Sequence, residues 1–516
     1  MNLDFFEKLL NYYSITNEDY QDLIRPVTIE NFMSSYKFNR IEEASHFVHE
    51  EINRGGKIMI YGDYDADGIM GTSILVKMFQ YIAYRAKYYV PSRYLDGYGL
   101  TLEKAKEALQ DGITLLITVD NGISALEPIK FLKDNGIKVV VLDHHTIQDE
   151  IPPADYIIHP EFSNFNGLAT SGAFVVFSFS LYFLNRFDKY LSTLASISLI
   201  SDMMPLKNFN RDFLRLVFSN YRKGEFKAVD LLLGDDNFDE NSIGMKIAPK
   251  INAVGRIIKD TSVNELIEYF TNDDLSTLLN YIQKIEQINT ERKNISKTMC
   301  DNIPKEDINS TAIVTKIDII EGLLGLVANH LMNKYHVPTI VFCEDQFNEL
   351  KGSCRAPEGF DTVNAFNSLS NYLSNFGGHA LAGGCSLSKD NYNVFKEKFI
   401  EYAKNNPIQH VEKPSLKISI SDINKENANL INSLSPFGEA WKAPLLRIEN
   451  INVSSLKYSR SYEHIMTNIG INSRLVGFGI SRDSLKDKKI INITGNLKTS
   501  KFLNYSYYDF NIKEVL

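Results

Sequence analysis

The sequence is poor in cysteine and in long apolar runs, and both shortages exclude broad classes of protein. Its 516 residues include only four cysteines, and none of them forms a Cys-x-x-Cys pair. We therefore expect reduced thiols in a cytoplasmic protein, without a disulfide framework or a zinc cluster. The longest apolar stretch, 173–184, contains serines and is too short to cross a bilayer, so it is interpreted as a buried helix. The start, MNLDFFEKLLNYY, lacks the pattern of a secretory signal, and no membrane partner is expected.

The chain also lacks a net positive charge, since its formal charge at pH 7 is -9. This argues against a passive, histone-like binder, but it allows an enzyme that grips nucleic acid through a local groove. The charge is uneven, because residues 411–516 hold 15 Lys and Arg against 10 Asp and Glu. With 44% apolar residues, a chain of this length is expected to form about three domains with sizeable cores.

A repeated pattern of short apolar runs, each ending on an aspartate, dominates the first half of the chain. The runs lie at 57–63, 114–120 and 138–143, and helical stretches at 102–109 and 125–134 separate them. Apolar runs without alternation, separated by helices, are typical of a parallel sheet that is buried on both faces. The pattern therefore predicts a doubly wound parallel-sheet α/β domain, in which YIIHP (156–160) is a candidate fourth strand.

The second half of the chain changes character twice. A polar helical segment at about 274–301 suits a connector, and a second α/β unit with strands such as ELKGSCR (349–355) follows it. From about 411 the runs alternate between apolar and polar residues, which indicates a small all-β barrel or sandwich. The predicted parts are an N-terminal helical segment (1–50), a catalytic α/β domain (51–270), a connector helix (271–304), a smaller α/β domain (305–408) and an all-β domain (409–516).

Carboxylates and imidazoles follow the three predicted strands. Loops at the carboxyl ends of parallel strands converge on one crevice, so these side chains are expected to meet there. Acidic groups gathered in a crevice need cations to neutralise them, and a carboxylate and imidazole set suits Mg²⁺ or Mn²⁺. Two such ions, about 3.5–4 Å apart, could activate water for phosphoryl hydrolysis. The residues concerned are Asp63, Asp65, Asp67, Asp120, Asp143, His144 and His145, with Asp202 further along the chain.

Each of these motifs also has a plainer interpretation. DYDADG resembles a calcium loop, although the EF-hand glutamate and its helices are missing. An aspartate after a strand is often a helix cap, and Asp143 could be only a cap or a partner of a ligand. A pair of histidines is more often structural. The recurrence of acidic motifs after three successive strands favours the metal centre over coincidence.

In chain order, DYDADG (63–68), DNG (120–122), DHH (143–145) and SDMMPL (201–206) resemble the four motifs of the DHH phosphoesterase family. The resemblance extends over roughly 50–516 and is most specific for the RecJ-like nucleases of that family. The stretches that carry it are VPSRYLDGYGL (90–100), IAPKINAVGRI (247–257), EGLLGLVANHL (321–331), GSCRAPEGF (352–360), GGHALAGG (377–384) and LSPFGE (434–439).

The resemblance implies a metal-dependent exonuclease that degrades single-stranded DNA from the 5′ end in DNA repair and recombination, with two Mn²⁺ or Mg²⁺ ions. It implies that Asp65, Asp67, Asp120, His144 and Asp202 bind the metals, with Asp120 bridging. His145 would contact the scissile phosphate and help the leaving group, and Asp63 would support the ligands. Residues implied to bind nucleic acid are Arg93, Arg256 in the NAVGR turn, Ser353, Arg355 and the loop Gly377-Gly378-His379.

The tail resembles the OB fold of the same family, which binds single strands through basic grooves and stacking aromatic rings. Candidate rings are Tyr458, Tyr462, Phe478, Tyr505, Tyr507 and Tyr508, although they could equally be core residues. The chain departs from the family at 440–444, where Ala-Trp-Lys-Ala-Pro replaces a Gly-Asn-Pro turn. By analogy we expect a monomer whose partners include a helicase and a single-strand binding protein.

Other functions remain open at this level. A phosphodiesterase for oligoribonucleotides or cyclic dinucleotides would share the chemistry, but it would not need the connector helix or the β-rich tail. A pyrophosphatase is disfavoured for the same reason. A catalytically inactive nucleic-acid-binding scaffold would be expected to have lost ligands, whereas all five are present here.

Overall fold

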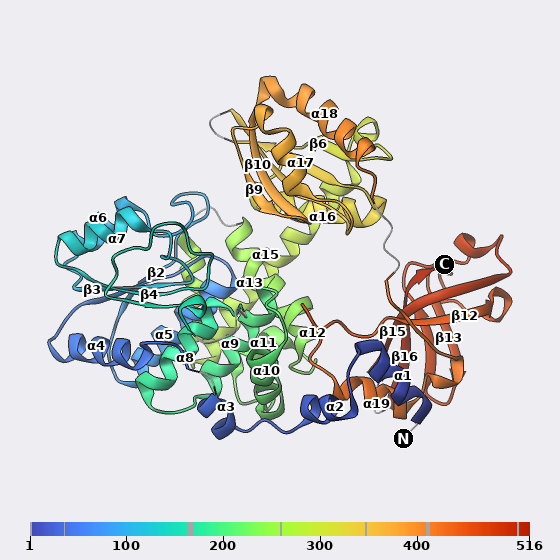
Figure 1. The fold of residues 1–516 in the computed structure, drawn as a ribbon, viewed down its shortest axis with the longest axis horizontal. Helices are drawn as coiled ribbons and strands as arrows, with labels where there is room; N and C mark the ends of the chain where they lie inside the picture. Colours follow the sequence, from blue (N-terminus) through green and yellow to red (C-terminus); the bar gives the residue numbers. More distant parts are fainter. Residues whose placement is uncertain are drawn as a thin grey trace. The chain divides into compact units, whose positions relative to one another are not determined.

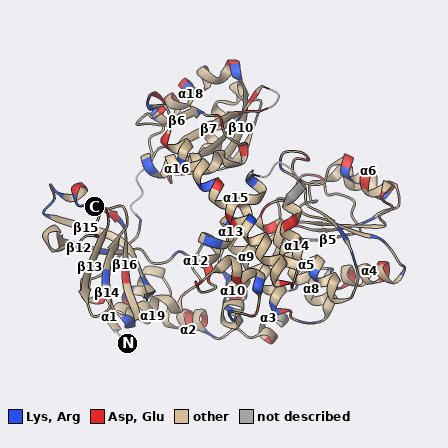
Figure 2. Ribbon diagram, turned by 180° about the vertical axis from the view of Figure 1, so that it is seen from behind, with Lys and Arg blue, Asp and Glu red and all other residues tan. Residues whose placement is uncertain are grey.

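The structure is a computed structural model that describes residues 3–35, 37–163, 169–257, 261–345, 348–408, 413–502 and 505–516. The chain divides into two compact units. The larger unit comprises 37–202 and 221–411, and the smaller comprises 1–36, 203–220 and 412–516. Basic and acidic residues are interspersed along the helices of both units (Figure 2).

A five-stranded parallel sheet forms the first domain of the larger unit, with the strand order β2-β1-β3-β4-β5. Helices α6 and α7 cover one face, and α4, α5 and α8 cover the other (Figure 1). The strands are β1 (Ile58–Tyr61), β2 (Lys87–Tyr89), β3 (Leu115–Val119), β4 (Lys138–Leu142) and β5 (Tyr156–Ile158). The helices are α4 (Ile41–Asn53), α5 (Ala66–Tyr81), α6 (Leu102–Gln110), α7 (Leu126–Asp134), α8 (Gly172–Leu184) and α9 (Lys189–Ser201).

The continuous apolar character of these strands follows from burial on both faces. Met59, Leu116 and Val139 belong to a core cluster with residues of α6 and α7, while Ile60 and Ile117 are also fully buried. The prediction of a doubly wound parallel sheet is therefore confirmed. In this strand order the direction of winding reverses between β1 and β3, so the loops that follow these two strands border one crevice.

Helices connect this sheet to a second, mixed sheet with the order β6-β7-β8-β10-β9. Separate apolar clusters cover the two faces of the second sheet. The connecting helices are α11 (Lys227–Leu233), α12 (Glu240–Ser242), α13 (Ala248–Ile257), α14 (Glu265–Thr271) and α15 (Leu275–Asp301). The second domain contains β6 (Ile313–Lys316), α16 (Leu324–Tyr335), β7 (Thr339–Glu344), β8 (Glu349–Arg355), α17 (Thr362–Ser368), β9 (Asn375–His379), β10 (Ala382–Ser388) and α18 (Tyr392–Asn405).

Two local predictions in these helices and strands were wrong. Gly377-Gly378-His379 is not a loop but the end of β9, which pairs with β10. Gly378 has a φ of 141°, and a Cβ atom there would lie 2.4 Å from the carbonyl oxygen of Ala382, so only glycine lets the strands approach so closely. Arg256 lies in the last turn of α13 rather than in a turn of the chain, because 248–257 continues as a helix.

The smaller unit is built on a six-stranded sheet with the order β11-β12-β15-β16-β14-β13. Phe5, Phe6 and Leu9 of α1 pack into the core of this sheet, so the N-terminal segment is structural here. The strands are β11 (Leu416–Lys417), β12 (Leu446–Asn452), β13 (Ile465–Gly470), β14 (Ser473–Gly477), β15 (Ile490–Phe502) and β16 (Tyr505–Val515). The helices are α1 (Leu3–Tyr13), α2 (Asn17–Ile24), α3 (Ile29–Ser35), α10 (Asn208–Asn220) and α19 (Lys425–Ser433).

The segment that departs from the family pattern has a defined packing role in this unit. The Trp441 indole N–H donates to the carbonyl of Leu434 at 3.0 Å, and its ring stacks on Tyr13 at 4.6 Å. Buried Arg211 of α10 donates to the carbonyls of Leu434 and Pro436 at 2.7 and 2.8 Å. The altered turn therefore fastens α1 and α10 to the sheet domain. Among the described residues, no helix is both long and apolar enough to span a membrane.

Candidate metal centre and basic cavity

The first acidic motif forms the turn between β1 and α5. Asp65 is the N-cap of α5, and its carboxylate accepts hydrogen bonds from the backbone N–H groups of Asp67 and Gly68 at 2.9 and 3.1 Å. A Cβ atom on Gly68 would lie 2.5 Å from the carbonyl oxygen of Asp63, so the turn needs glycine at this position. The strand, the cap and the glycine together direct three carboxylates into the crevice.

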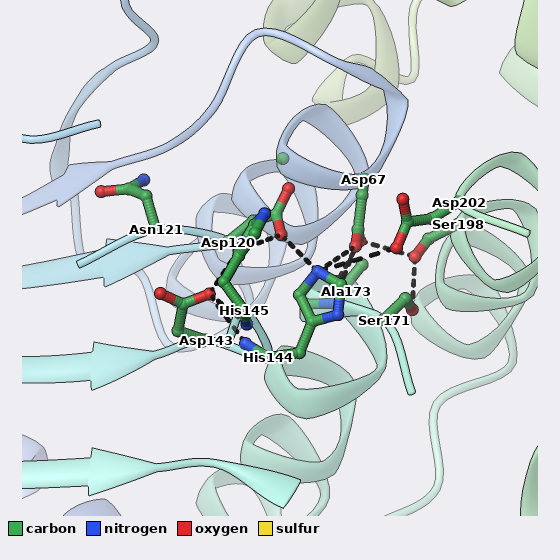
Figure 3. Close-up of polar contacts among 12 residues, drawn as sticks. Asp67, Asp120, Asn121, Asp143, His144, His145, Ser171, Ala173, Ser198 and Asp202 are labelled. Carbon is green, nitrogen blue, oxygen red and sulfur yellow. Dashed lines mark hydrogen bonds and ion pairs between the residues drawn. The ribbon is translucent and has the colours of Figure 1, made fainter. Parts of the chain in front are cut away.

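Asp67 is fixed by donors from two other helices. The backbone N–H groups of Gly172 and Ala173, in the first turn of α8, each donate to its carboxylate at 2.7 Å. The hydroxyl of Ser198 on α9 donates to the same carboxylate at 2.6 Å (Figure 3). The positive end of a helix dipole and a hydroxyl thus hold a buried carboxylate in one orientation. Ser198 was not predicted from the sequence, because its spacing from Asp67 carries no local signal.

Asp120 follows β3 in a left-handed backbone conformation, with φ of 59°. This conformation is unusual for a residue other than glycine, and it is held by the neighbouring Asn121. The Asn121 amide donates to the carbonyls of Val119 and Gly62 at 2.8 and 3.1 Å, which ties the ends of β3 and β1 together. A Cβ atom on Gly172 would lie 2.6 Å from Asp120 Oδ1, so α8 approaches the carboxylate closely.

Asp143 organises the turn that follows β4. It accepts the backbone N–H of Ile123 at 2.9 Å, that of His144 at 2.7 Å, and the ring Nδ1–H of His145 at 2.8 Å. Burial alone would raise the pKa of Asp143, but the bond from His145 and further hydrogen bonds lower it to about 2. Burial opposes the charge on His145, yet the bond to Asp143 raises the pKa of His145 to about 9. His145 is therefore a protonated imidazole at neutral pH.

His144 points away from His145, into the acidic cluster (Figure 3). Its Nε2 lies 3.1 Å from Asp120 Oδ1, 3.5 Å from Asp67 Oδ2 and 3.7 Å from Asp202 Oδ2. Asp202 is the C-cap residue of α9. The structure therefore brings side chains from three strand ends and a helix end within a few ångströms of one another.

The cluster has the properties of a divalent cation site. Burial and, after it, the charges of neighbouring carboxylates together raise the pKa of Asp63 and of Asp202 to about 8. The buried Asp63 Oδ1, Asp120 Oδ1 and Asp202 Oδ2 accept no hydrogen bond from any described residue. Cations would satisfy these oxygens and relieve the repulsion. Three sets of side chains offer ligand atoms within 4.8 Å of one another: Asp67, His144 and Asp202; Asp63, Asp65 and Asp120; and Asp120, His144 and His145.

Two further residues that were not predicted from the sequence support His145. The Tyr98 hydroxyl is hydrogen-bonded to His145 Nε2 at 2.9 Å. Tyr98 lies between Gly97 and Gly99, whose φ angles of 81° and 72° give the loop its sharp path. His159, directly after β5, is hydrogen-bonded through Nε2 to the carbonyl oxygen of His145 at 2.9 Å. The glycines on either side of Tyr98 indicate a turn in the sequence, but nothing in the sequence marked Tyr98 or His159 as partners of His145.

A second feature of the larger unit is a cavity of about 630 Å³ that is rich in basic side chains. Arg93, Arg256, Lys351 and Arg355 line it, and Glu321 is the acidic residue in its wall. Ser353 and Gly377 also line it, so five of the seven residues predicted to bind nucleic acid meet there. Gly378 and His379 lie further along β9 and do not line the cavity.

The arginines of this cavity outnumber the acidic groups around them. Burial lowers the pKa of Arg256, and the charges of Arg93, Arg292 and Arg355 lower it further. Arg292, on the connector helix α15, was not predicted. Arg355 donates through Nη1 to Ser353 Oγ at 3.1 Å and to the carbonyl of Cys354 at 2.7 Å, which orients its guanidinium. Such a group of cations suits a phosphate ligand.

Some of the candidate stacking rings of the smaller unit are exposed, and the others are half-buried or covered by another side chain. Phe478, Tyr505 and Tyr462 are 71%, 63% and 57% exposed. Tyr507 lies under the Arg474 guanidinium at 4.0 Å, and Arg474 pairs with Asp509 at 2.7 Å. Tyr458 and Tyr508 are half-buried. Their role in binding single strands stays a prediction.

The fold and the acidic crevice define a DHH-type domain, and the comparisons agree. Residues 57–201 match the model of the DHH family, N-terminal domain; 309–405 match the DHHA1 domain; and 415–514 match the RecJ OB domain. The chain is therefore similar to the DHH family over 57–201, and two further domain models match the part of the chain that follows.

Three known proteins illustrate the similarity. The single-stranded-DNA-specific exonuclease RecJ of Bacillus subtilis is 30% identical over 94% of this chain, which spans 64% of the length of that relative. The crystal structure of RecJ from Thermus thermophilus in complex with Mn²⁺ superposes with a TM-score of 0.82 at 21% identity, covering all of this chain and 78% of that chain. A crystal structure of exonuclease RecJ bound to manganese has a TM-score of 0.62 at 25% identity and covers 72% of this chain and 96% of that one.

Proposed function

We propose that this protein is a metal-dependent exonuclease that hydrolyses single-stranded DNA from the 5′ end, in DNA repair and recombination. The observation that carries the proposal is that one unit contains both an acidic crevice suited to cations and an arginine-rich cavity suited to phosphate. Similarity to a single-stranded-DNA-specific exonuclease over 94% of the chain supports the same activity.

Asp65, Asp67, Asp120, His144 and Asp202 would hold two Mn²⁺ or Mg²⁺ ions, with Asp120 between them. This assignment is supported by the buried carboxylate oxygens without hydrogen bonds and by the membership of Asp120 in two of the three candidate ligand sets. The ions would supply Lewis acidity, which lowers the pKa of water and offsets negative charge on a phosphoryl group. Asp63 contributes to the same cluster and supports Asp65.

His145 would donate a proton to the leaving group. Hydrolysis near the 5′ end separates a nucleotide whose 3′ oxygen must gain a proton. His145 is protonated at neutral pH, is held by Asp143 through Nδ1, and directs Nε2 toward Tyr98 and away from Asp143. An imidazolium in that position can donate the proton from Nε2. Asp143 then acts by orienting the ring and stabilising its charge.

The arginine cavity would hold the phosphate groups of the strand. Arg355 and Ser353 form one oriented pair of donors, and Arg93 and Arg256 add charge from the first domain. Gly377, Gly378 and His379 would contact the backbone along β9. Binding a terminal phosphate at a fixed place relative to the acidic crevice would make cleavage start from an end.

The parts of the chain would divide this work. The DHH catalytic domain is assigned to 51–270, the DHH-associated domain to 305–408, and the OB-fold domain that binds single strands to 409–516. We further propose a cytoplasmic monomer that acts with a helicase and a single-strand binding protein. The four buried, free cysteines suit a reducing compartment.

The test uses a short DNA strand labelled at its 3′ end and incubated with Mn²⁺. It is run beside the corresponding duplex, an RNA copy and a copy blocked at the 5′ end. Progressive shortening of the free DNA strand alone is the expected result. Turnover of only very short RNA would replace the proposal by an oligoribonucleotide phosphodiesterase. Binding without cleavage under all conditions would replace it by a scaffold.

A further inference from the structure

His159 is a buried histidine, outside the acidic motifs, that contacts the turn carrying His144 and His145. It is 1% exposed and follows the last residue of β5. Its Nε2 lies 2.9 Å from the carbonyl oxygen of His145, and its Nδ1 lies 3.2 Å from the backbone nitrogen of Glu161. Both ring nitrogens therefore have backbone partners.

These two partners determine the tautomer of the ring. A backbone N–H can only donate, so Nδ1 of His159 must accept the bond from Glu161. A carbonyl oxygen can only accept, so Nε2 must carry the proton that binds the oxygen of His145. His159 is thus a neutral ring that joins the strand end after β5 to the turn after β4.

Hydrogen bonds at both ends hold the turn itself. Asp143 binds the backbone N–H groups of His144 and His145 at 2.7 and 3.2 Å, which fixes the start of the turn. The carbonyl of His145 is fixed by His159. Adjacent side chains must point in different directions here, His144 into the acidic cluster and His145 onto Asp143. Rotation of the peptide that carries the His145 carbonyl would disturb both.

We propose that His159 is a positioning residue, which sets the directions of His144 and His145 by anchoring the His145 carbonyl. The inference rests on the proposed function, because it assigns roles to these two histidines. It predicts that loss of the bond weakens metal binding and slows catalysis together, while affinity for DNA, which depends on the arginine cavity, stays the same.

Two substitutions separate the two bonds of the ring. In His159→Gln the amide nitrogen can replace Nε2 and keep the bond to the carbonyl. In His159→Asn the shorter side chain can replace Nδ1 but does not reach that carbonyl. We expect His159→Asn to lower Mn²⁺ affinity and kcat by about 10- to 100-fold, as loss of a partner of a ligand does, with KM unchanged. His159→Gln should retain most of both.

A matched control is His49→Asn. His49 also bonds a backbone carbonyl through Nε2, that of Phe183 at 3.1 Å, but it lies on α4, outside the acidic motifs. Its substitution should leave Mn²⁺ affinity and kcat unchanged. The measurements are calorimetric titration with Mn²⁺ alone and steady-state cleavage of a labelled single strand, both on the full chain, with thermal unfolding as a check of folding.

Equal Mn²⁺ affinity and kcat in folded His159→Asn and the parent would overturn the proposal. Equal losses in His159→Gln and His159→Asn would also overturn it, because they would show that the ring shape matters rather than the bond. If the parent protein cleaves no nucleic acid, the proposed function fails, but the Mn²⁺ titrations still decide the role of His159.

Discussion

The acidic crevice and the arginine cavity belong to the same unit and have opposite charge, but each carries the same kind of electrostatic cost. In the crevice, burial and neighbouring carboxylates raise the pKa of Asp63 and Asp202. In the cavity, burial and neighbouring guanidinium groups lower the pKa of Arg256. In both regions the gathered charge is destabilising, and a ligand of opposite charge would relieve it.

The difference lies in how the side chains are held. In the crevice, backbone N–H groups and Ser198 fix the Asp67 carboxylate, and Asp143 fixes the turn that carries His144. In the cavity, Arg93 Nε is buried and has no hydrogen-bond partner among the described residues. Fixed geometry suits ions with strict coordination, whereas cations on long side chains suit a phosphate that moves as the strand advances. Under the proposed function, a phosphodiester and its metal ions would complement both regions at once.

The largest expected effect comes from removing one charge from the crevice. Asp120→Asn should lower cleavage by about 10⁴-fold or more, because the residues of such a site act as a unit. The same change should raise the thermal midpoint of the metal-free protein, because it removes repulsion among buried carboxylates. Asp134→Asn, an exposed aspartate on α7, is the control. If the Asp120→Asn variant cleaves DNA as fast as the parent, the acidic crevice is not the catalytic site.

His145→Ala tests the general acid and is expected to be less severe. Loss of a positioned proton donor should lower kcat by about 10²- to 10⁴-fold. Mn²⁺ affinity should change little, since His145 bonds Asp143 and Tyr98 rather than the centre of the acidic cluster. Single-turnover cleavage and calorimetry measure the two quantities. A parallel loss of both would make His145 a metal ligand instead.

Arg355→Ala tests the cavity. A hydrogen bond from a charged group contributes about 1.5–3 kcal/mol, so KM should rise about 10- to 150-fold while kcat falls less. The control is Lys389→Ala in the same domain, whose exposed ammonium pairs with Glu344 outside the cavity. An effect on kcat alone would indicate that Arg355 serves the chemical step rather than binding.

Phe478→Ala should have a smaller effect that depends on strand length. Stacking of one base on an exposed ring contributes about 1–3 kcal/mol, so binding of long single strands should weaken while very short substrates are cleaved as before. Ile471→Ala removes an apolar side chain that is 94% exposed but has no ring. Equal losses in both variants would show that the sheet surface binds by apolar contact, without base stacking.

A separate prediction concerns the pH dependence of stability without metal. Asp63 and Asp202 have folded pKa values of about 8, whereas an unfolded aspartate titrates near pH 4. Between these values the folded protein binds more protons than the unfolded chain, so stability falls as the pH rises from about 4 to 8. Asp143, with a pKa of about 2, changes stability in the opposite direction and only below about pH 4.

Thermal unfolding of the metal-free protein at several pH values measures this slope, and Asp202→Asn should reduce it. Saturating Mn²⁺ should abolish the decline, because the ions bind the deprotonated carboxylates. A flat profile without metal would contradict the view that repulsion dominates the crevice.

The sequence was sufficient for the framework of the site. Apolar runs that end on aspartate predicted β1, β3 and β4. Because loops at the carboxyl ends of parallel strands converge on one crevice, the same pattern predicted that Asp67, Asp120 and His144 meet. The predicted connector at about 274–301 corresponds to α15, and ELKGSCR corresponds to β8. These predictions were correct because the periodicity of apolar residues, the length of a helix and the position of a strand end are local properties of the sequence.

The contacts that hold the site were not predictable in the same way. Ser198 and Gly172 bind Asp67 from residues more than a hundred positions away, and His159 acts through a backbone carbonyl. Such contacts depend on helix packing, which leaves no periodic signal. The glycines of β9 were mistaken for a loop, because the close approach of strands and a tight turn both require glycine.

The most direct test is the diffraction of crystals soaked with Mn²⁺ and a short, 5′-phosphorylated single strand. The account predicts two anomalous peaks about 3.5–4 Å apart on either side of the Asp120 carboxylate, with the terminal phosphate against Arg355 and Ser353. Absence of manganese from the crevice, or a terminal phosphate bound away from the arginine cavity, would contradict it.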